Sequence, residues 1–185
     1  MLHCFGFESV AVVVGDLYFQ DPEPDRGQEG PEHGVRLEVR MLRGGDLRGS
    51  IYSAAPLSVE ELVWRADLLE SMAGQPNSHD RMHHHPTARG WEPGKRKFVP
   101  ELTRDPLPWV GAQLCDLDTL LDQAGIDRTG VDARDAQSLR DSVPEILDVT
   151  GRLLDRVRSG ELGVAPPGTP PWDGVTHTLV RNGWL

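Results

Sequence analysis

The clearest pattern of apolar and polar positions is an alternation between residues 35 and 42. Its apolar members are Val35, Leu37, Val39 and Met41, and its charged members are Arg36, Glu38 and Arg40. Successive side chains of a strand point to opposite faces of a sheet, so this pattern predicts a strand with one buried face. The turn residues Gly44 and Gly45 follow, and a weaker alternation resumes at Leu47. We therefore expect a β-hairpin over about residues 35–54.

Two further segments have strand-like composition. Residues 10–20 are rich in β-branched and aromatic side chains, which is typical of a well-buried strand. Residues 175–185 alternate again, which favours a final strand that returns beside the N-terminal strands. Between the first two strands, residues 21–32 are acidic and rich in proline, with almost no apolar side chain to bury. This segment predicts a solvated loop.

Helical spacing begins at residue 59. Apolar residues recur three and four positions apart over 59–73, after a capping-box pattern of Ser58 and Glu61, and predict an amphipathic helix that covers one sheet face. A shorter helix is expected between Asp116 as its cap and Gly125 as its terminator. Two more are expected over 133–141 and from Ser142 to about Ser159, the second with Pro144 in its first turn.

This order of elements predicts an α+β fold. The strands come first and most helices later, so a small antiparallel sheet packed by three to four helices is expected rather than a parallel βαβ array. A length of 185 residues fits a single domain, 1–185. Residues 75–108 contain six prolines and no sustained periodicity, and predict a long irregular loop. A loop of this length in a compact domain is usually functional or disordered.

Charge and cysteine content narrow the function classes. Lysine and arginine total 19 against 29 acidic residues, and the net charge of −10 argues against a general nucleic-acid binder or a protein of anionic membrane surfaces. The sequence lacks a signal-peptide pattern and a bilayer-length apolar run, so a cytoplasmic protein is expected. Cys4 and Cys115 match no metal-ligand spacing, and we expect two free thiols buried as small hydrophobes.

The densest chemical feature is a histidine cluster, because four of the seven histidines lie between positions 79 and 85. Neutral imidazole is the commonest transition-metal ligand. In an extended segment His83 and His85 share a side, whereas in a helix His79 and His83 share a face. We therefore take His79, His83 and His85 as candidate ligands of a divalent transition metal. We take His83, His85 and Asp80 as candidate acid–base groups. The alternative is a polar loop whose histidines are solvated.

Basic and aromatic residues follow the histidines. Over residues 76–100 the local balance of charged side chains is positive, although the whole chain is acidic. Arg89, Lys95 and Arg96 can hold a phosphate or carboxylate, and Trp91 offers a flat surface for stacking. These four residues are the candidate ligand-binding set. The alternative interpretation is that the cations pair with acidic side chains of the protein itself.

Two functional hypotheses follow. The first is a small cytoplasmic ligand-binding protein or accessory enzyme that acts on an anionic or aromatic small molecule, with the histidine-rich loop for metal binding or proton transfer. The second is a non-enzymatic interaction module, such as an immunity, antitoxin-like or regulatory protein, that uses acidic faces against a basic protein partner. The sequence contains no motif typical of dinucleotide or Walker-type nucleotide binding, and no GxSxG nucleophile elbow.

Overall fold

The computed structural model describes residues 1–169 as a mixed α+β fold, which confirms the predicted class. Five antiparallel strands pair in chain order to form one sheet. They are β1 (Leu2–Gly6), β2 (Val10–Gln20), β3 (Pro31–Gly44), β4 (Leu57–Ser71) and β5 (His83–His85). A small hairpin consists of β6 (Ala88–Arg89) and β7 (Glu92–Pro93). The helices are α1 (Pro100–Arg104), α2 (Pro106–Leu114), α3 (Leu117–Ala124) and α4 (Asp135–Arg158), and a 3₁₀ turn spans Arg128–Gly130.

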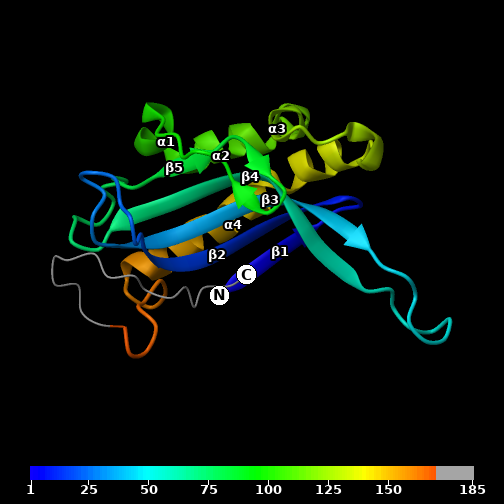
Figure 1. Cartoon of the computed structure of the whole chain (residues 1–185), viewed down its shortest axis with the longest axis horizontal. Coiled ribbons are helices and arrows are strands. Elements are labelled where there is room, and N and C mark those ends of the chain that lie inside the picture. Colours follow the sequence, from blue (N-terminus) through cyan, green and yellow to red (C-terminus); the bar gives the residue numbers. More distant parts are fainter. Residues whose placement is uncertain (170–185) are drawn as a thin grey trace.

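The helices cover one face of the sheet. Helix α4 crosses β2 and β3, α3 contacts β4, and α2 packs on α4 (Figure 1). The predicted alternation of β3 gives this face its apolar side chains, and α4 adds a stripe that includes Leu139, Ile146 and Leu153. The opposite face of β3 carries Arg36, Glu38 and Arg40, as the alternation requires. The sheet therefore has one apolar face under the helices and one charged face.

The predicted helix over 59–73 is wrong, because these residues form strand β4. The second half of β4 is buried on both faces, so apolar side chains occupy most of its positions on either side. These apolar residues also match helical spacing, which led to the prediction of a helix. Ser58 and Glu61 lie within the strand and cap no helix. Trp64, which the helix pattern placed at the edge of an apolar stripe, is fully buried in the core.

The predicted hairpin over 35–54 has the right first strand and the wrong second one. β3 pairs with β4, and residues 45–56 form the connection between them. This connection extends beyond the body of the sheet (Figure 1) and exposes Ile51 and Tyr52, at 84% and 92% of their surface. The weak alternation from Leu47 onward has no neighbouring strand to pair with, because residues 57–71 occupy that position in the sheet.

The predicted irregular loop over 75–108 contains more structure than expected, namely β5, the small hairpin, α1 and the start of α2. Prolines at the first positions of α1 and α2 begin helices here instead of breaking them. The two helices expected over 133–141 and 142–159 are a single helix, α4, with Pro144 inside it. The shorter helix is confirmed, with Asp116 as its cap and Gly125 in the left-handed conformation after its last turn.

Three other expectations concern the cysteines, the membrane and the C-terminus. Cys4 and Cys115 are free, as expected, but both are exposed, so their interpretation as buried hydrophobes is wrong. Among residues 1–169, no helix is both long and apolar enough to cross a bilayer. The strand expected over 175–185 lies outside the described residues.

Candidate metal centre

Strand β5 consists of three consecutive histidines that point to alternate faces of the sheet. His84 enters the apolar face, where Trp64 Nε1 donates a hydrogen bond of 3.3 Å to its Nδ1, and Trp109 packs against its ring. Burial lowers the pKa of His84 to about 4, and the nearby charges of Lys97 and the neighbouring histidines act in the same direction. His84 is therefore a neutral packing residue. The extended conformation places His83 and His85 together on the charged face.

His83 and His85 meet Asp67 on that face. In the antiparallel register Asp67 lies opposite His83 and Arg65 lies opposite His85. The Nε2 atoms of both histidines lie 3.3 Å from the same oxygen, Oδ2 of Asp67. Asp67 is fully buried and the two histidines are nearly so. Three ligand-type atoms, one from each residue, all lie within 4.8 Å of one another.

Backbone carbonyls determine how the two imidazoles are protonated. The Nδ1 atom of His83 lies 2.8 Å from the carbonyl oxygen of Arg81, and that of His85 lies 2.7 Å from the carbonyl oxygen of Gly94. A carbonyl only accepts hydrogen bonds, so both Nδ1 atoms carry the proton and donate it. In the neutral rings each Nε2 then presents a lone pair toward Asp67. Metal-binding histidines typically have this arrangement, with one nitrogen held by a carbonyl and the other on the metal.

The Nε2 atom of His85 is buried and makes no hydrogen bond with any residue of the described chain. A buried polar atom without a partner costs roughly 1–3 kcal/mol, so it requires an explanation. Two groups could occupy the space between Nε2 and the Asp67 carboxylate, namely a proton on the imidazole or a cation shared by all three residues. A metal ion would contact both histidines and the carboxylate at once.

Two arginines also hold the Asp67 carboxylate. Arg36, its neighbour across β3 and β4, donates Nε to Oδ1 at 2.7 Å. Arg65 donates Nε to Oδ2 at 2.7 Å and places Nη2 at 2.6 Å from the same oxygen. Burial opposes ionisation of Asp67, but the positive charges of Arg36 and Arg65 hold its pKa well below the ordinary value. Asp67 is therefore ionised and fixed in orientation.

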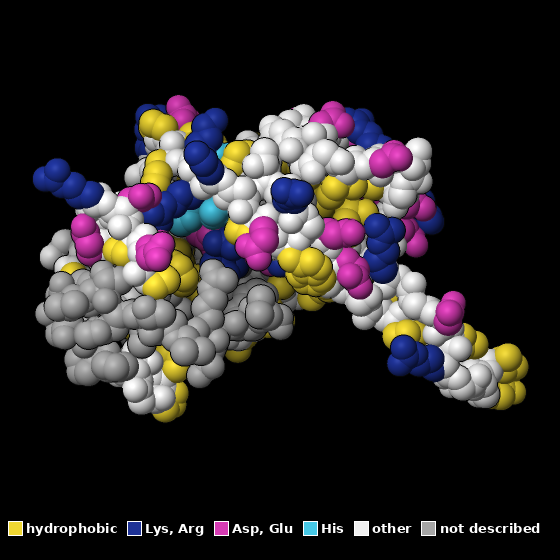
Figure 2. Space-filling view, in the orientation of Figure 1, with side chains coloured by type: hydrophobic (Ala, Val, Ile, Leu, Met, Phe, Trp, Pro, Cys, Tyr) yellow, Lys and Arg dark blue, Asp and Glu magenta, His cyan; other side chains and the backbone are white. Residues whose placement is uncertain are grey.

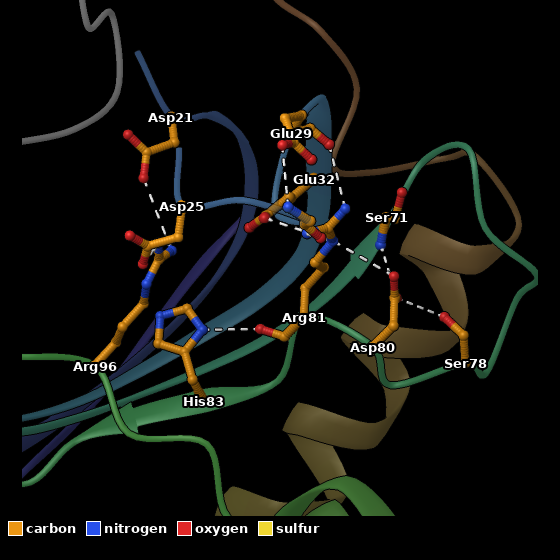
Figure 3. A network of polar contacts seen from close by, with 11 residues as sticks. Asp21, Asp25, Glu29, Glu32, Ser71, Ser78, Asp80, Arg81, His83 and Arg96 are labelled. Atoms are coloured by element: carbon orange, nitrogen blue, oxygen red, sulfur yellow. Dashed lines mark hydrogen bonds and ion pairs between the residues drawn. The ribbon is translucent and has the colours of Figure 1, made fainter. Parts of the chain in front are cut away.

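The loop between β2 and β3, residues 21–30, lies across from His83 and is held by two further arginines (Figure 3). Arg81 donates to the carbonyl oxygens of Gly27 and Glu29, at 2.7 and 3.2 Å. Arg96 donates to Asp25 at 2.6 Å and lies 3.8 Å from Asp21. The prediction of an acidic loop over 21–32 is thus correct in its first part, while β3 already begins at Pro31.

Glu32 lies beside Arg81 in the same view (Figure 3), buried, with its carboxylate 3.8 Å from Nε of Arg81. Burial raises the pKa of Glu32 to about 7, and the positive charges of Arg81 and Arg96 reduce the shift without cancelling it. A carboxyl group that titrates near neutral pH is thus part of the surroundings of the centre.

A shallow, open apolar pocket lies beside the centre at Phe98. The ring of Phe98 packs on that of His83, with 5.4 Å between the ring centroids. The pocket has a volume of about 400 Å³ and is lined by Phe98, Val99, Pro100, Thr103 and Arg104. The depression in which histidine side chains are visible at the surface is surrounded by both basic and acidic side chains (Figure 2).

Of the predicted metal ligands and acid–base groups, the structure brings His83 and His85 together and places the other two elsewhere. His79 Nδ1 lies 2.8 Å from the carbonyl oxygen of Thr103, and its Nε2 lies 3.2 Å from Arg158. This histidine connects the β4–β5 loop to α1 and α4. Asp80 accepts hydrogen bonds from Ser78 and from the backbone of Ser71, and stabilises the turn before β5.

The predicted ligand-binding residues lie around the small hairpin and the chain after it. Trp91 lies over the guanidinium of Arg40, 4.9 Å from the ring centroid, and Arg96 pairs with the 21–30 loop. Arg89 and Lys95 are exposed and form no salt bridge with a residue in the described part of the chain. Arg96 therefore pairs with acidic residues of the protein itself, as the alternative interpretation predicts.

Sequence reasoning missed Asp67 and its two arginines. Asp67 fell within the incorrectly predicted helix, where a single carboxylate suggests a solvent-facing position. A signal existed nonetheless, because Arg65 and Asp67 alternate with Trp64, Ala66 and Leu68 in an otherwise apolar segment. A strand assignment would have placed them beside Arg36.

Two imidazoles and one carboxylate can bind a divalent transition metal and leave coordination positions open. Such a set is found in catalytic zinc sites and in non-haem iron sites. A metal held in this way can act as a Lewis acid toward an oxygen of a bound small molecule. No protein-family model, curated protein or solved structure matches this chain, so the arguments for its function come from the geometry alone.

Proposed function

We propose that Asp67, His83 and His85 bind one divalent transition-metal ion, and that the protein is a small-molecule-binding protein or accessory enzyme that works through this ion. The observation that carries the proposal is the pair of Nε2 atoms, each 3.3 Å from the same oxygen of a fully buried aspartate. Both rings are already oriented by carbonyls at Nδ1, and one Nε2 has no other partner in the described chain.

The competing explanation is that both histidines are protonated and form a structural ion-pair cluster. That arrangement would place two imidazolium groups beside Arg36 and Arg65, four cations around a single buried carboxylate. Burying unpaired positive charge is costly. A metal ion lets both rings remain neutral and shares one divalent charge among three ligands. Two extra protons and one divalent ion add the same charge of +2, so the preference for the metal rests on geometry, because a single ion would contact both Nε2 atoms and Oδ2 of Asp67 at once.

The test is metal binding by untagged protein that has first been treated with a chelator. Zinc or cobalt content and affinity are measured for the wild type and for the His83→Asn and His85→Asn variants. The matched control is His79→Asn, which changes a nearby partly buried histidine outside the centre. We expect a single ion per chain in the wild type and the control. Each ligand variant should bind at least about 100-fold more weakly.

Absence of stoichiometric metal from the wild type, or equal binding by all three variants, would contradict the proposal. Circular dichroism of each variant separates loss of a ligand from loss of the fold. A variant that does not fold is replaced by a measurement on the wild type, in which bound metal should raise the unfolding temperature. At about 100 times its dissociation constant, a bound ligand adds about 2.7 kcal/mol of stability.

The interaction-module hypothesis remains a prediction. Arginines take up part of the negative charge on which it depends, since Arg128 pairs with Asp118 and Asp122, and Arg134 pairs with Asp132. It predicts salt-sensitive capture of a basic partner. A protein that binds no metal and captures such a partner would support this second function instead.

A further inference from the structure

Arg36 lies beside the metal centre and has hydrogen-bonding capacity that no residue of 1–169 uses. Its Nε is committed to Asp67, but neither of its two Nη groups makes a hydrogen bond with a residue in 1–169. The side chain is only 14% exposed. A guanidinium presents its Nη groups as a planar fork that suits a carboxylate or phosphate. Arg36 thus holds the metal-binding carboxylate with one edge, and the described residues leave its Nη fork without a partner.

Charge on this face of the sheet is unbalanced once a metal is present. Four arginines, at positions 36, 40, 65 and 81, accompany three carboxylates, Glu32, Glu38 and Asp67. With the three carboxylates ionised, these seven side chains carry a net charge of +1, and a divalent ion raises it to +3. Excess positive charge in a largely buried layer attracts an anion. Three protein ligands leave coordination positions on the metal open. An anionic ligand would fill such a position and would also offset the excess positive charge.

The geometry allows one small molecule to reach both the Arg36 guanidinium and the metal position. Arg36 contacts Oδ1 of Asp67 while the histidine nitrogens face Oδ2, so the fork and the metal position lie on one carboxylate. Bond lengths limit their separation to less than about 10 Å. The β2 residue opposite Arg36 is Gly15, which places no side chain of its own beside the guanidinium. Figure 2 shows histidine side chains in a depression that opens to the surface nearby.

We infer that Arg36 and the metal ion together bind the oxyanion of a small molecule, either a carboxylate or a phosphate. This inference rests on the proposed metal centre and adds the chemical class of its ligand. Arg36 is the specificity residue because it presents the fork. The shallow apolar pocket beside Phe98 offers a surface for the less polar part of the same molecule.

The experiment is a titration of cobalt-loaded protein, freed of excess metal, with succinate and separately with inorganic phosphate. Visible absorption of the bound cobalt reports a change in its ligands. We expect a saturable spectral change with at least one of the two anions, and the anion that produces it identifies the class. Arg36→Lys preserves the positive charge beside Asp67 but removes the fork, so it should weaken the response, expressed per bound cobalt, at least about 10-fold.

The matched control is Arg43→Lys, on the same strand and 55% exposed, which should respond as the wild type does. If cobalt binds but neither anion changes its spectrum, or Arg36→Lys responds as the wild type, the oxyanion site is wrong and the metal centre stands. If the wild type takes up no cobalt, the proposed function fails and the joint site fails with it. Cobalt content, measured on every sample, distinguishes these outcomes.

Discussion

Replacement of Asp67 by asparagine is the most informative single perturbation of the metal-free protein. The two residues have nearly the same shape, but the amide cannot neutralise Arg36 and Arg65, whose Nε atoms lie 2.7 Å from the carboxylate oxygens. The change therefore leaves two cations facing each other in a layer from which water is largely excluded. Asp67→Asn should destabilise the fold even when no metal is present.

The magnitude follows from how deeply the group is buried. Removing one partner of a buried ion pair costs roughly 3–5 kcal/mol because the remaining charge has no compensation. Asp67 has no exposed surface, but its arginine partners retain 14% and 12% of theirs, so some water can reach them. We therefore expect a loss near the lower limit, about 3 kcal/mol. A surface pair would cost less than about 1 kcal/mol.

The assay is urea unfolding at neutral pH in the presence of a chelator. The control Asp80→Asn changes a carboxylate that is 38% exposed and paired with Arg81, and should cost about 1 kcal/mol or less. The double variant Asp67→Asn/Arg36→Met should recover part of the loss, because it removes one of the opposed cations. A loss below about 1 kcal/mol in Asp67→Asn would refute the account of a buried, arginine-held carboxylate.

The pH dependence gives the same prediction an independent check. The pKa of Asp67 is lowered in the folded state, so its stabilisation is complete above the unfolded value of about 3.9. This stabilisation is lost as the pH falls through the lower folded value. The difference in stability between the wild type and Asp67→Asn should therefore shrink as the pH falls below about 4.

Three further variants test the surroundings of the centre. The pKa of Glu32 is raised to about 7, so the metal-free protein should lose about 3 kcal/mol of stability as the pH rises from about 4.5 to 7. In urea unfolding, Glu32→Gln should abolish this pH dependence. Arg96→Ala removes the contacts with Asp25 and Asp21, and should change stability by less than about 1 kcal/mol while speeding amide exchange in residues 21–30. Trp64→Ala should cost about 3–5 kcal/mol by thermal unfolding, because the indole is fully buried. An unchanged pH slope, an unchanged exchange rate or a loss below about 1 kcal/mol would contradict the respective prediction.

The fold class could be predicted because its strongest signals are local. The alternation of β3, the β-branched run of β2 and the Asp116 cap of α3 each depend on a few neighbouring residues. β4 could not be identified in this way, because helices cover one side and charged residues of adjacent strands lie on the other. A strand buried on both sides loses the alternation that identifies a half-exposed one. The short alternation around Arg65 and Asp67 favours a strand, and the pairing of β4 with β3 establishes it.

The candidate site was half predictable for the same reason. His83 and His85 are two residues apart, so their common side follows from an extended backbone. Asp67 lies sixteen positions before His83, and the two come together only through the antiparallel register of β4 and β5. His79 was grouped with the other histidines by sequence proximity, but its backbone has a positive φ of 53° and its ring contacts α1 and α4.

The measurement that tests the metal centre most directly is anomalous diffraction from crystals of the zinc-loaded protein. We predict a single anomalous peak between Nε2 of His83, Nε2 of His85 and Oδ2 of Asp67, at about 2.0–2.2 Å from each. The Nδ1 atoms of both histidines should still donate to the carbonyls of Arg81 and Gly94. A zinc ion bound at other residues, or an empty centre in protein with zinc in excess, would contradict the account.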